Sequence, residues 1–192
     1  MAKERVLEIF REIGVLREGH FLLTSGRHSD RYMQCAKLFE YPKYSELLCG
    51  ELARRFADCG VDIVVGPAVG GIIMSYEVSR ALGVRNIFAE RQDGKMAMRR
   101  GFTVEPNSRV LVVEDVITTG GSVKEVIELV RGMGAESVGV GVIVDRSDGK
   151  AELGYRTEAI LSVNVESYEA ADCPLCSRGI DLVQPGSRGM KR

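Results

Sequence analysis

The stretch VLVVEDVITTGGS, residues 110–122, decides the fold. An apolar run rich in β-branched residues ends in two adjacent carboxylates, Glu114 and Asp115, and then passes through a turn of hydroxyl residues and glycines. A helical pattern follows over residues 122–131. Unbroken apolar runs are typical of strands buried on both faces of a parallel sheet that helices cover. The stretch therefore predicts a strand, turn and helix unit of an α/β protein.

The turn in this stretch has the composition of an anion-binding site. Gly120 and Gly121 allow the backbone to approach a ligand closely, and the start of the following helix offers free N–H groups. Hydroxyl donors come from Thr118, Thr119 and Ser122. We expect this cradle to bind a phosphate monoester. Because ligands of open α/β sheets bind beyond the carboxyl ends of the strands, the two acids would meet hydroxyls or a metal, which indicates a sugar next to the phosphate.

Other phosphate-binding motifs do not fit the segment. It lacks the Gly-Lys-Ser/Thr ending of a nucleoside-triphosphate loop and the GxGxxG spacing of a dinucleotide turn. The structural alternative is a strand that ends in solvated acids and leads into a capped helix.

The same alternation extends on both sides of this unit. The pattern predicts strands over residues 62–65, 86–89, 110–114 and 137–144, and helices over residues 71–82 and 122–131. We therefore expect a doubly wound, mainly parallel sheet over about residues 61–145.

The flanking segments are less regular. Helices are predicted over residues 4–13, capped by Gly14, and over residues 44–59, while residues 21–23 and 32–35 form short extended candidates around the turn TSGRHSD. The stretch ERQDGKMAMRRGF, residues 90–102, loses periodicity and predicts a long exposed loop. The tail from Cys173 onward is expected to be irregular.

Composition excludes several classes of protein. The length of 192 residues suits one domain, and 26 basic against 27 acidic residues leave a net charge of −1, which gives no global field for nucleic acid or an anionic membrane. No apolar run approaches the roughly 18 residues of a membrane span, and no signal peptide is recognised. An odd number of cysteines, five, fits reduced thiols in a cytoplasm.

Cys173 and Cys176 form a single CxxC pair near the end of the chain. A tetrahedral zinc site needs two more thiolate or imidazole ligands nearby, and the two histidines, His20 and His28, lie far upstream. The sequence therefore does not favour zinc, and the role of the pair stays open.

Residues 110–122 resemble the phosphoribosyl pyrophosphate motif of the type I phosphoribosyltransferases. Within that family, HFLLTSGRHSDRYMQ, residues 20–34, resembles the signature of the members that use orotate. Further matches are residues 66–68 after the first core strand, Arg91 and Lys95 in the long loop, and residues 145–146. The resemblance implies one domain over residues 1–192, with a core at about 61–145 and a small hood built from residues 1–40 and the C-terminal segment.

The resemblance also implies a role for each matching residue. Residues of the phosphoribosyl pyrophosphate site would be Arg91, Lys95, Glu114, Asp115, Val116, Ile117, Thr118, Thr119, Gly120, Gly121 and Ser122. Lys95 and Asp115 would be catalytic, Thr118 and Arg146 would contact orotate, and Tyr32 and Met33 would pack against the pyrimidine ring. Mg²⁺ would bind through substrate oxygens with no direct protein ligand. The family further implies a homodimer with shared active sites.

Four positions depart from the family pattern. Many members carry lysine where this chain has Thr24, Gly70 and Gln92, and a histidine near Ala97. Arg99 and Arg100 are candidates to supply the missing positive charge.

The expected reaction transfers the phosphoribosyl group to orotate and releases pyrophosphate. Two alternatives stay open: a phosphoribosyltransferase for a purine or for uracil, and a regulator that senses phosphoribosyl pyrophosphate without catalysis. The resemblance favours turnover, because the acids and the basic loop residues that it assigns to catalysis are all present.

Overall fold

A six-stranded sheet in the order β5-β4-β3-β6-β7-β8 forms the centre of the computed structural model, which describes residues 1–23 and 25–185. Its strands are β3 (Ile63–Pro67), β4 (Arg85–Gln92), β5 (Lys95–Met98), β6 (Arg109–Ile117), β7 (Glu136–Asp145) and β8 (Thr157–Ser162). All neighbouring strands run parallel except β4 and β5. The predicted doubly wound, mainly parallel α/β fold is thus confirmed.

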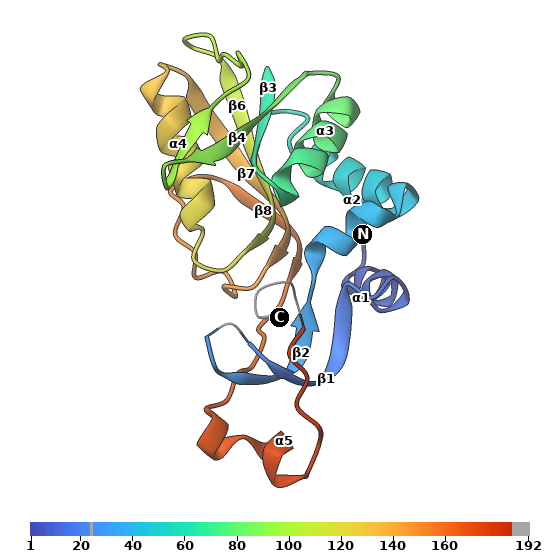
Figure 1. Ribbon diagram of the computed structural model, residues 1–192. Helices are drawn as coiled ribbons and strands as arrows, with labels where there is room; N and C mark the ends of the chain where they lie inside the picture. The colour runs from blue at the N-terminus through green and yellow to red at the C-terminus, as the bar shows by residue number, and fades with distance from the viewer. Residues whose placement is uncertain (24, 186–192) are drawn as a thin grey trace.

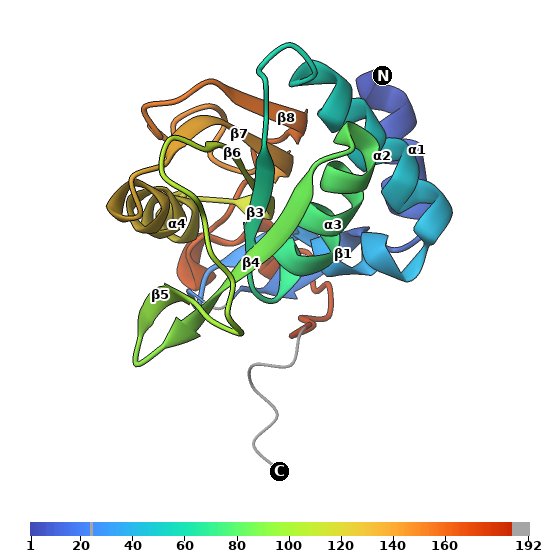
Figure 2. The same ribbon diagram turned by 90° about the horizontal axis from the view of Figure 1, so that it is seen from above.

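Helices cover both faces of the sheet because its central strands are apolar on both sides (Figure 2). One face, with Val64 and Leu111, packs against α1 (Lys3–Glu12), α2 (Pro42–Arg55) and α3 (Gly70–Leu82). The other face, with Val65 and Val112, packs against α4 (Gly121–Gly132). Successive strand residues point to opposite faces, so an unbroken apolar run supplies both layers. No helix among the described residues is long and apolar enough to span a membrane.

A smaller antiparallel pair, β1 (Leu16–Leu22) and β2 (His28–Met33), lies below the sheet in Figure 1. Two segments near the end of the chain join it through isolated bridges, Phe21 with Val183 and His28 with Tyr168. The short helices η2 (Ala170–Asp172) and α5 (Pro174–Ser177) lie between those two bridges in the sequence, and η1 (Cys35–Glu40) links β2 to α2.

The expected loop over residues 90–102 is wrong as far as Met98. Strand β4 continues to Gln92 and returns as β5, with Gln92 paired to Lys95. Asp93 and Gly94, with φ of 50° and 81°, make the two-residue turn. Asp-Gly is a strong signal for such hairpins because both turn positions need a positive φ, and the polar strands around it concealed the signal.

Other boundaries also differ from those expected. Helix α2 ends at Arg55 instead of residue 59, and β6 continues three residues past Glu114. Strand β8 was not predicted, because it lies at the sheet edge and only Ile160 and Leu161 in it are well buried. The tail is not wholly irregular, since it contains α5 and the bridge at Val183. Residues 186–192 lie outside the described residues.

Candidate active site

The two acids lie inside strand β6, not at its end. Glu114 pairs with Val142 of β7, and β6 stays paired as far as Ile117, opposite Asp145. The expected strand end at Glu114 is therefore wrong by three residues. Alternating strand side chains explain why Glu114 lines a pocket beside α4, whereas Asp115 lies against the start of α3.

The predicted phosphate turn connects β6 to α4. Gly120 has a φ of 74°, and a Cβ there would lie 2.5 Å from Leu153, so glycine is required on both grounds. Helix α4 begins at Gly121 and leaves its first amides free. A pocket of about 250 Å³ lies at this turn, and it is lined by Arg91, Glu114, residues 116–123 and Glu125. The turn therefore has the form of an anion site in an accessible hollow.

Burial raises the pKa of both acids. Burial and the neighbouring Asp115 raise the pKa of Glu114 to about 9, and burial also raises the pKa of Asp115. The Asp115 amide donates to Glu114 Oε1 at 3.2 Å. Two carboxyl groups held together in this way favour a proton, a cation or hydroxyl donors as partners.

Arg91 reaches the pocket from the β4–β5 hairpin. Its guanidinium donates to both oxygens of Glu125 on α4, at 2.8 and 2.9 Å, and to the Gly94 carbonyl oxygen at 2.8 Å. Lys95 does not line this pocket; it lies along a separate groove with Met96 and Glu128. The structure thus brings Arg91, but not Lys95, to the phosphate turn of the same chain.

Asp145 and Arg146 have separate surroundings in the described part of the chain. Asp145 is buried and accepts hydrogen bonds from the Ser147 amide at 2.7 Å, the Ser147 hydroxyl at 2.6 Å and the Gly149 amide at 3.1 Å. The Nε of Arg146 is buried and has no partner among the described residues. Asp145 therefore organises the following turn and leaves Arg146 available.

Arg146 also lies in the electrostatic neighbourhood of the acid pair. Burial raises the pKa of the Cys35 thiol, and the charge of Asp115 raises it further, whereas the charge of Arg146 lowers it. All three side chains thus act on one region between β6, β7 and η1. A guanidinium whose buried Nε lacks a partner within the described part of the chain is suited to a planar carboxylate ligand.

Tyr32 and Met33, which were expected to pack against the pyrimidine ring, have different surroundings in the structure. Met33 is buried in the core, and Tyr32 is half-buried with its ring 5.8 Å from that of Phe21. Neither lines the pocket at the phosphate turn.

The departures from the family pattern have local explanations at some positions. A Cβ at Gly70 would lie 2.5 Å from Asp115 Oδ2, so a lysine there would require the acid to move. Gln92 and Ala97 belong to the hairpin, and Thr24 lies outside the described residues. Arg100 pairs with Glu90 at 2.8 Å.

Sequence reasoning missed Glu125 and the constraint at Gly70. Glu125 lies on the exposed side of α4, and nothing in its local pattern distinguishes it from other charged helix residues. The small residues at 70–71 before an apolar helix were a usable signal for a close approach.

Comparison with known proteins gives the family. Residues 45–170 match the phosphoribosyl transferase domain family. The chain is 60% identical over 188 residues to the orotate phosphoribosyltransferase of Caldanaerobacter subterraneus subsp. tengcongensis, covering 98% of this chain and 99% of that protein.

Solved structures agree with this match. The Mycobacterium tuberculosis orotate phosphoribosyltransferase in complex with inorganic phosphate has a TM-score of 0.67 at 27% identity, over 83% of this chain and 95% of that one. The Leishmania donovani UMP synthase has a TM-score of 0.71 at 26% identity, over 85% of this chain and 37% of that longer one. Because the domain match covers residues 45–170 and the identity reaches 60% over nearly the whole length, this chain belongs to the orotate phosphoribosyltransferase family.

Proposed function

We propose that this chain transfers the 5-phosphoribosyl group from phosphoribosyl pyrophosphate to orotate, which gives orotidine 5′-phosphate and pyrophosphate in pyrimidine biosynthesis. The observation that carries the proposal is the pocket at the β6–α4 turn, where free helix amides and threonine hydroxyls lie beside Glu114. A phosphate next to a ribose matches this combination of donors and acceptors.

Each group has a role in this reaction. Residues 118–122 hold the 5-phosphate, and Glu114 and Asp115 accept hydrogen bonds from the ribose hydroxyls. Arg146 donates to orotate, as does the Thr118 hydroxyl, and the unpartnered Nε of Arg146 supports its part. Orotate N1 gives up its proton, which leaves with pyrophosphate, and forms a bond to C1 of the ribose while the bond from C1 to pyrophosphate breaks, through a transition state with oxocarbenium character. The protein contributes positioning, charge neutralisation and exclusion of water.

Arg91 and Lys95 neutralise the departing pyrophosphate in this proposal. The position of Arg91 at the pocket supports its role directly. Lys95 lies in a separate groove, so its role requires either movement of the hairpin or the site of a second copy. A homodimer with shared sites satisfies the second condition and is part of the proposal.

Mg²⁺ is the proposed cofactor, and the donor set fits it. The half-buried carboxyl groups of Glu114 and Asp115 are hard oxygen acceptors, suited to orient ribose hydroxyls that would share the ion. Bound mainly to pyrophosphate and ribose oxygens, the ion supplies charge neutralisation. Glu114 and Asp115 contribute by orienting the hydroxyls that share it.

The remaining expectations also belong to the proposal. We infer one domain over residues 1–192, with its core at about 61–145 and a hood from residues 1–40 and the C-terminal segment; the bridges that join Phe21 to Val183 and His28 to Tyr168 support the hood. The five free cysteines support a cytoplasmic location. The near-neutral charge supports small-molecule substrates over nucleic acid or a membrane surface.

An assay of base choice tests the function. Purified protein with phosphoribosyl pyrophosphate and Mg²⁺ is offered orotate, uracil, hypoxanthine and xanthine separately, and pyrophosphate release is measured. We expect turnover with orotate alone. Turnover with uracil or a purine, and none with orotate, would contradict the assignment of orotate as the base. Binding of phosphoribosyl pyrophosphate without turnover of any base would favour the sensing regulator.

A further inference from the structure

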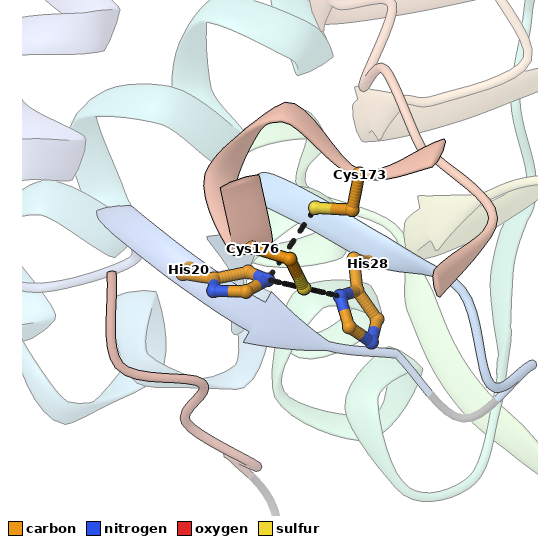
Figure 3. Close-up of side chains that lie close together, drawn as sticks. All are labelled: His20, His28, Cys173 and Cys176. Atoms are coloured by element: carbon orange, nitrogen blue, oxygen red, sulfur yellow. Dashed lines mark hydrogen bonds between the residues drawn. The ribbon is translucent and has the colours of Figure 1, made fainter. Parts of the chain in front are cut away.

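Four side chains with the chemistry of zinc ligands converge where the hood segments meet. His20 on β1, His28 on β2, and Cys173 and Cys176 at helix α5 point toward one another (Figure 3). Their candidate ligand atoms all lie within 4.8 Å of one another. His20, His28 and Cys173 are buried, and Cys176 closes the cluster from the exposed side. The fold thus brings together the histidines and the CxxC pair that are far apart in the sequence.

Three distances between nitrogen and sulfur atoms match the edges of a coordination tetrahedron. Bonds of about 2.3 Å to sulfur and about 2.0–2.1 Å to nitrogen place the ligand atoms of tetrahedral zinc about 3.3–3.8 Å apart. His20 Nε2 lies 3.5 Å from Cys173 Sγ and 3.7 Å from Cys176 Sγ. His28 Nδ1 lies 3.3 Å from Cys176 Sγ. The two imidazole nitrogens are 2.9 Å apart, a hydrogen-bond distance that metal binding would lengthen to about 3.3 Å.

The contacts of His20 indicate which of its two ring nitrogens carries the hydrogen. Its Nδ1 lies 2.7 Å from the Ile180 carbonyl oxygen, which can only accept, so Nδ1 carries the hydrogen. Nε2 therefore presents its lone pair to the cluster. A backbone carbonyl that orients a histidine in this way is typical of metal ligands.

This part of the hood also has little apolar packing of its own. Neither of the two apolar clusters of the molecule includes a residue from 17–32 or from 166–185 within the described chain. Phe21 and Leu175 are buried there, and the other connections include backbone bridges and polar contacts such as those of Arg27 with Ser167 and Glu169 and of Ser29 with Glu166. Small segments without a core are commonly stabilised by a structural metal.

We propose that His20 Nε2, His28 Nδ1 and the thiolates of Cys173 and Cys176 bind one structural Zn²⁺ that joins α5 to the β1–β2 pair. Binding displaces a proton from each thiol, the ring hydrogen of His28 moves from Nδ1 to Nε2, and two thiolates balance the charge of the ion. Four protein ligands complete the tetrahedron and leave no position for substrate, so the ion has no part in the chemistry.

Metal content is the first test. The untagged chain is purified under reducing conditions from zinc-supplemented cells, and bound metals are measured by mass spectrometry. We expect about one zinc per chain in the wild type and in Cys59→Ser, a matched control at a half-buried cysteine outside the cluster. Cys176→Ser and Cys173→Ser should lose most of it. Zinc well below one per chain in the wild type, or full zinc in both cluster variants, would overturn the proposal.

Two measurements on the wild type do not depend on whether the variants fold. After zinc removal, added Co²⁺ should produce the visible bands of tetrahedral cobalt with thiolate charge transfer. Chelation should also raise amide exchange in residues 17–32 and 166–185 several-fold while the central sheet stays protected. The absence of those cobalt bands, a Cys173–Cys176 disulfide in the reduced preparation, or unchanged exchange in the hood would contradict a structural zinc.

Discussion

At the residue scale, Asp115 is the side chain whose charge the proposed reaction needs most. Asp115→Asn keeps the shape but removes the charge-assisted hydrogen bonds to the ribose hydroxyls, which are worth about 1.5–3 kcal/mol each. We expect turnover to fall by roughly 10²-fold or more with the melting temperature preserved. Steady-state kinetics with a thermal melt as control checks this. Near-normal turnover would make the acid pair structural.

The neighbouring acid predicts a pH dependence of stability. Because the pKa of Glu114 is raised from 4.5 to about 9, the folded protein keeps a proton that the unfolded chain releases. Stability is therefore lost as pH rises through this interval. Glu114→Gln removes that loss, so the ligand-free variant should be more stable than wild type by on the order of 1–2 kcal/mol at pH 8 and about equal at pH 5. Denaturant titrations at both values measure the difference; equal stability at pH 8 would mean that the pair is already compensated.

The residues of the phosphate turn were predictable because they are adjacent in the sequence. Glu114, Asp115 and residues 118–122 belong to one strand, turn and helix unit, so local pattern was enough to place them together. The contact of Arg91 with Glu125 joins a hairpin to a helix 34 residues away, and only the folded sheet brings the two together. The histidine and cysteine cluster depends on pairing across more than 140 residues, which no local pattern encodes.

At the element scale, the β4–β5 hairpin is the segment best suited to move. β5 is a four-residue strand at the sheet edge, its residues are at most half-buried, and the Arg91–Glu125 pair fastens the hairpin to α4. Exposed ion pairs contribute little to stability, and lids are drawn from segments of low local stability. We expect the amides of residues 93–102 to exchange quickly in the free protein.

Hydrogen exchange followed by mass spectrometry, with and without phosphoribosyl pyrophosphate and Mg²⁺, measures this. Peptides from the hairpin should gain protection on binding, and peptides from β7 should serve as unchanged controls. Hairpin amides that are already protected, with no change on binding, would remove a closing lid from the mechanism.

The sequence pattern predicted the central strands and the helices that cover them, and it missed the two edge strands. Central strands β3, β6 and β7 are rich in buried β-branched residues, a pattern typical of strands covered on both faces of a parallel sheet. Strands β5 and β8 lie at opposite edges of the sheet, where half the surface is uncovered and the residues can be polar. Edge strands therefore carry a weaker periodic signal than central ones.

At the scale of the whole molecule, a shared-site dimer predicts complementation. Lys95→Ala and Arg146→Ala should each be nearly inactive alone, because every site of each homodimer carries one lesion. If Lys95 serves the partner's site, a mixed dimer places both lesions in one site and leaves the other intact. Mixing the two inactive proteins should then restore up to roughly a quarter of wild-type activity, half of the sites in about half of the dimers.

Activity after subunit exchange, with native mass spectrometry to prove the exchange, decides the point. No recovery in proven mixed dimers would mean that each chain builds its own site. Lys95 would then have to reach the pocket by movement of its own hairpin.

The bridges from β1 and β2 to Val183 and Tyr168 have a consequence for biosynthesis. A chain emerging from the ribosome N-terminus first can assemble the sheet as soon as β8 has been made, whereas the bridges of β1 and β2 must wait for Tyr168 and Val183. During that interval His20, Phe21 and His28 have no partners from the tail and are exposed to other chains. Premature termination after residue 165 would leave a folded sheet carrying an open strand pair, which is a natural substrate for chaperones or proteolysis.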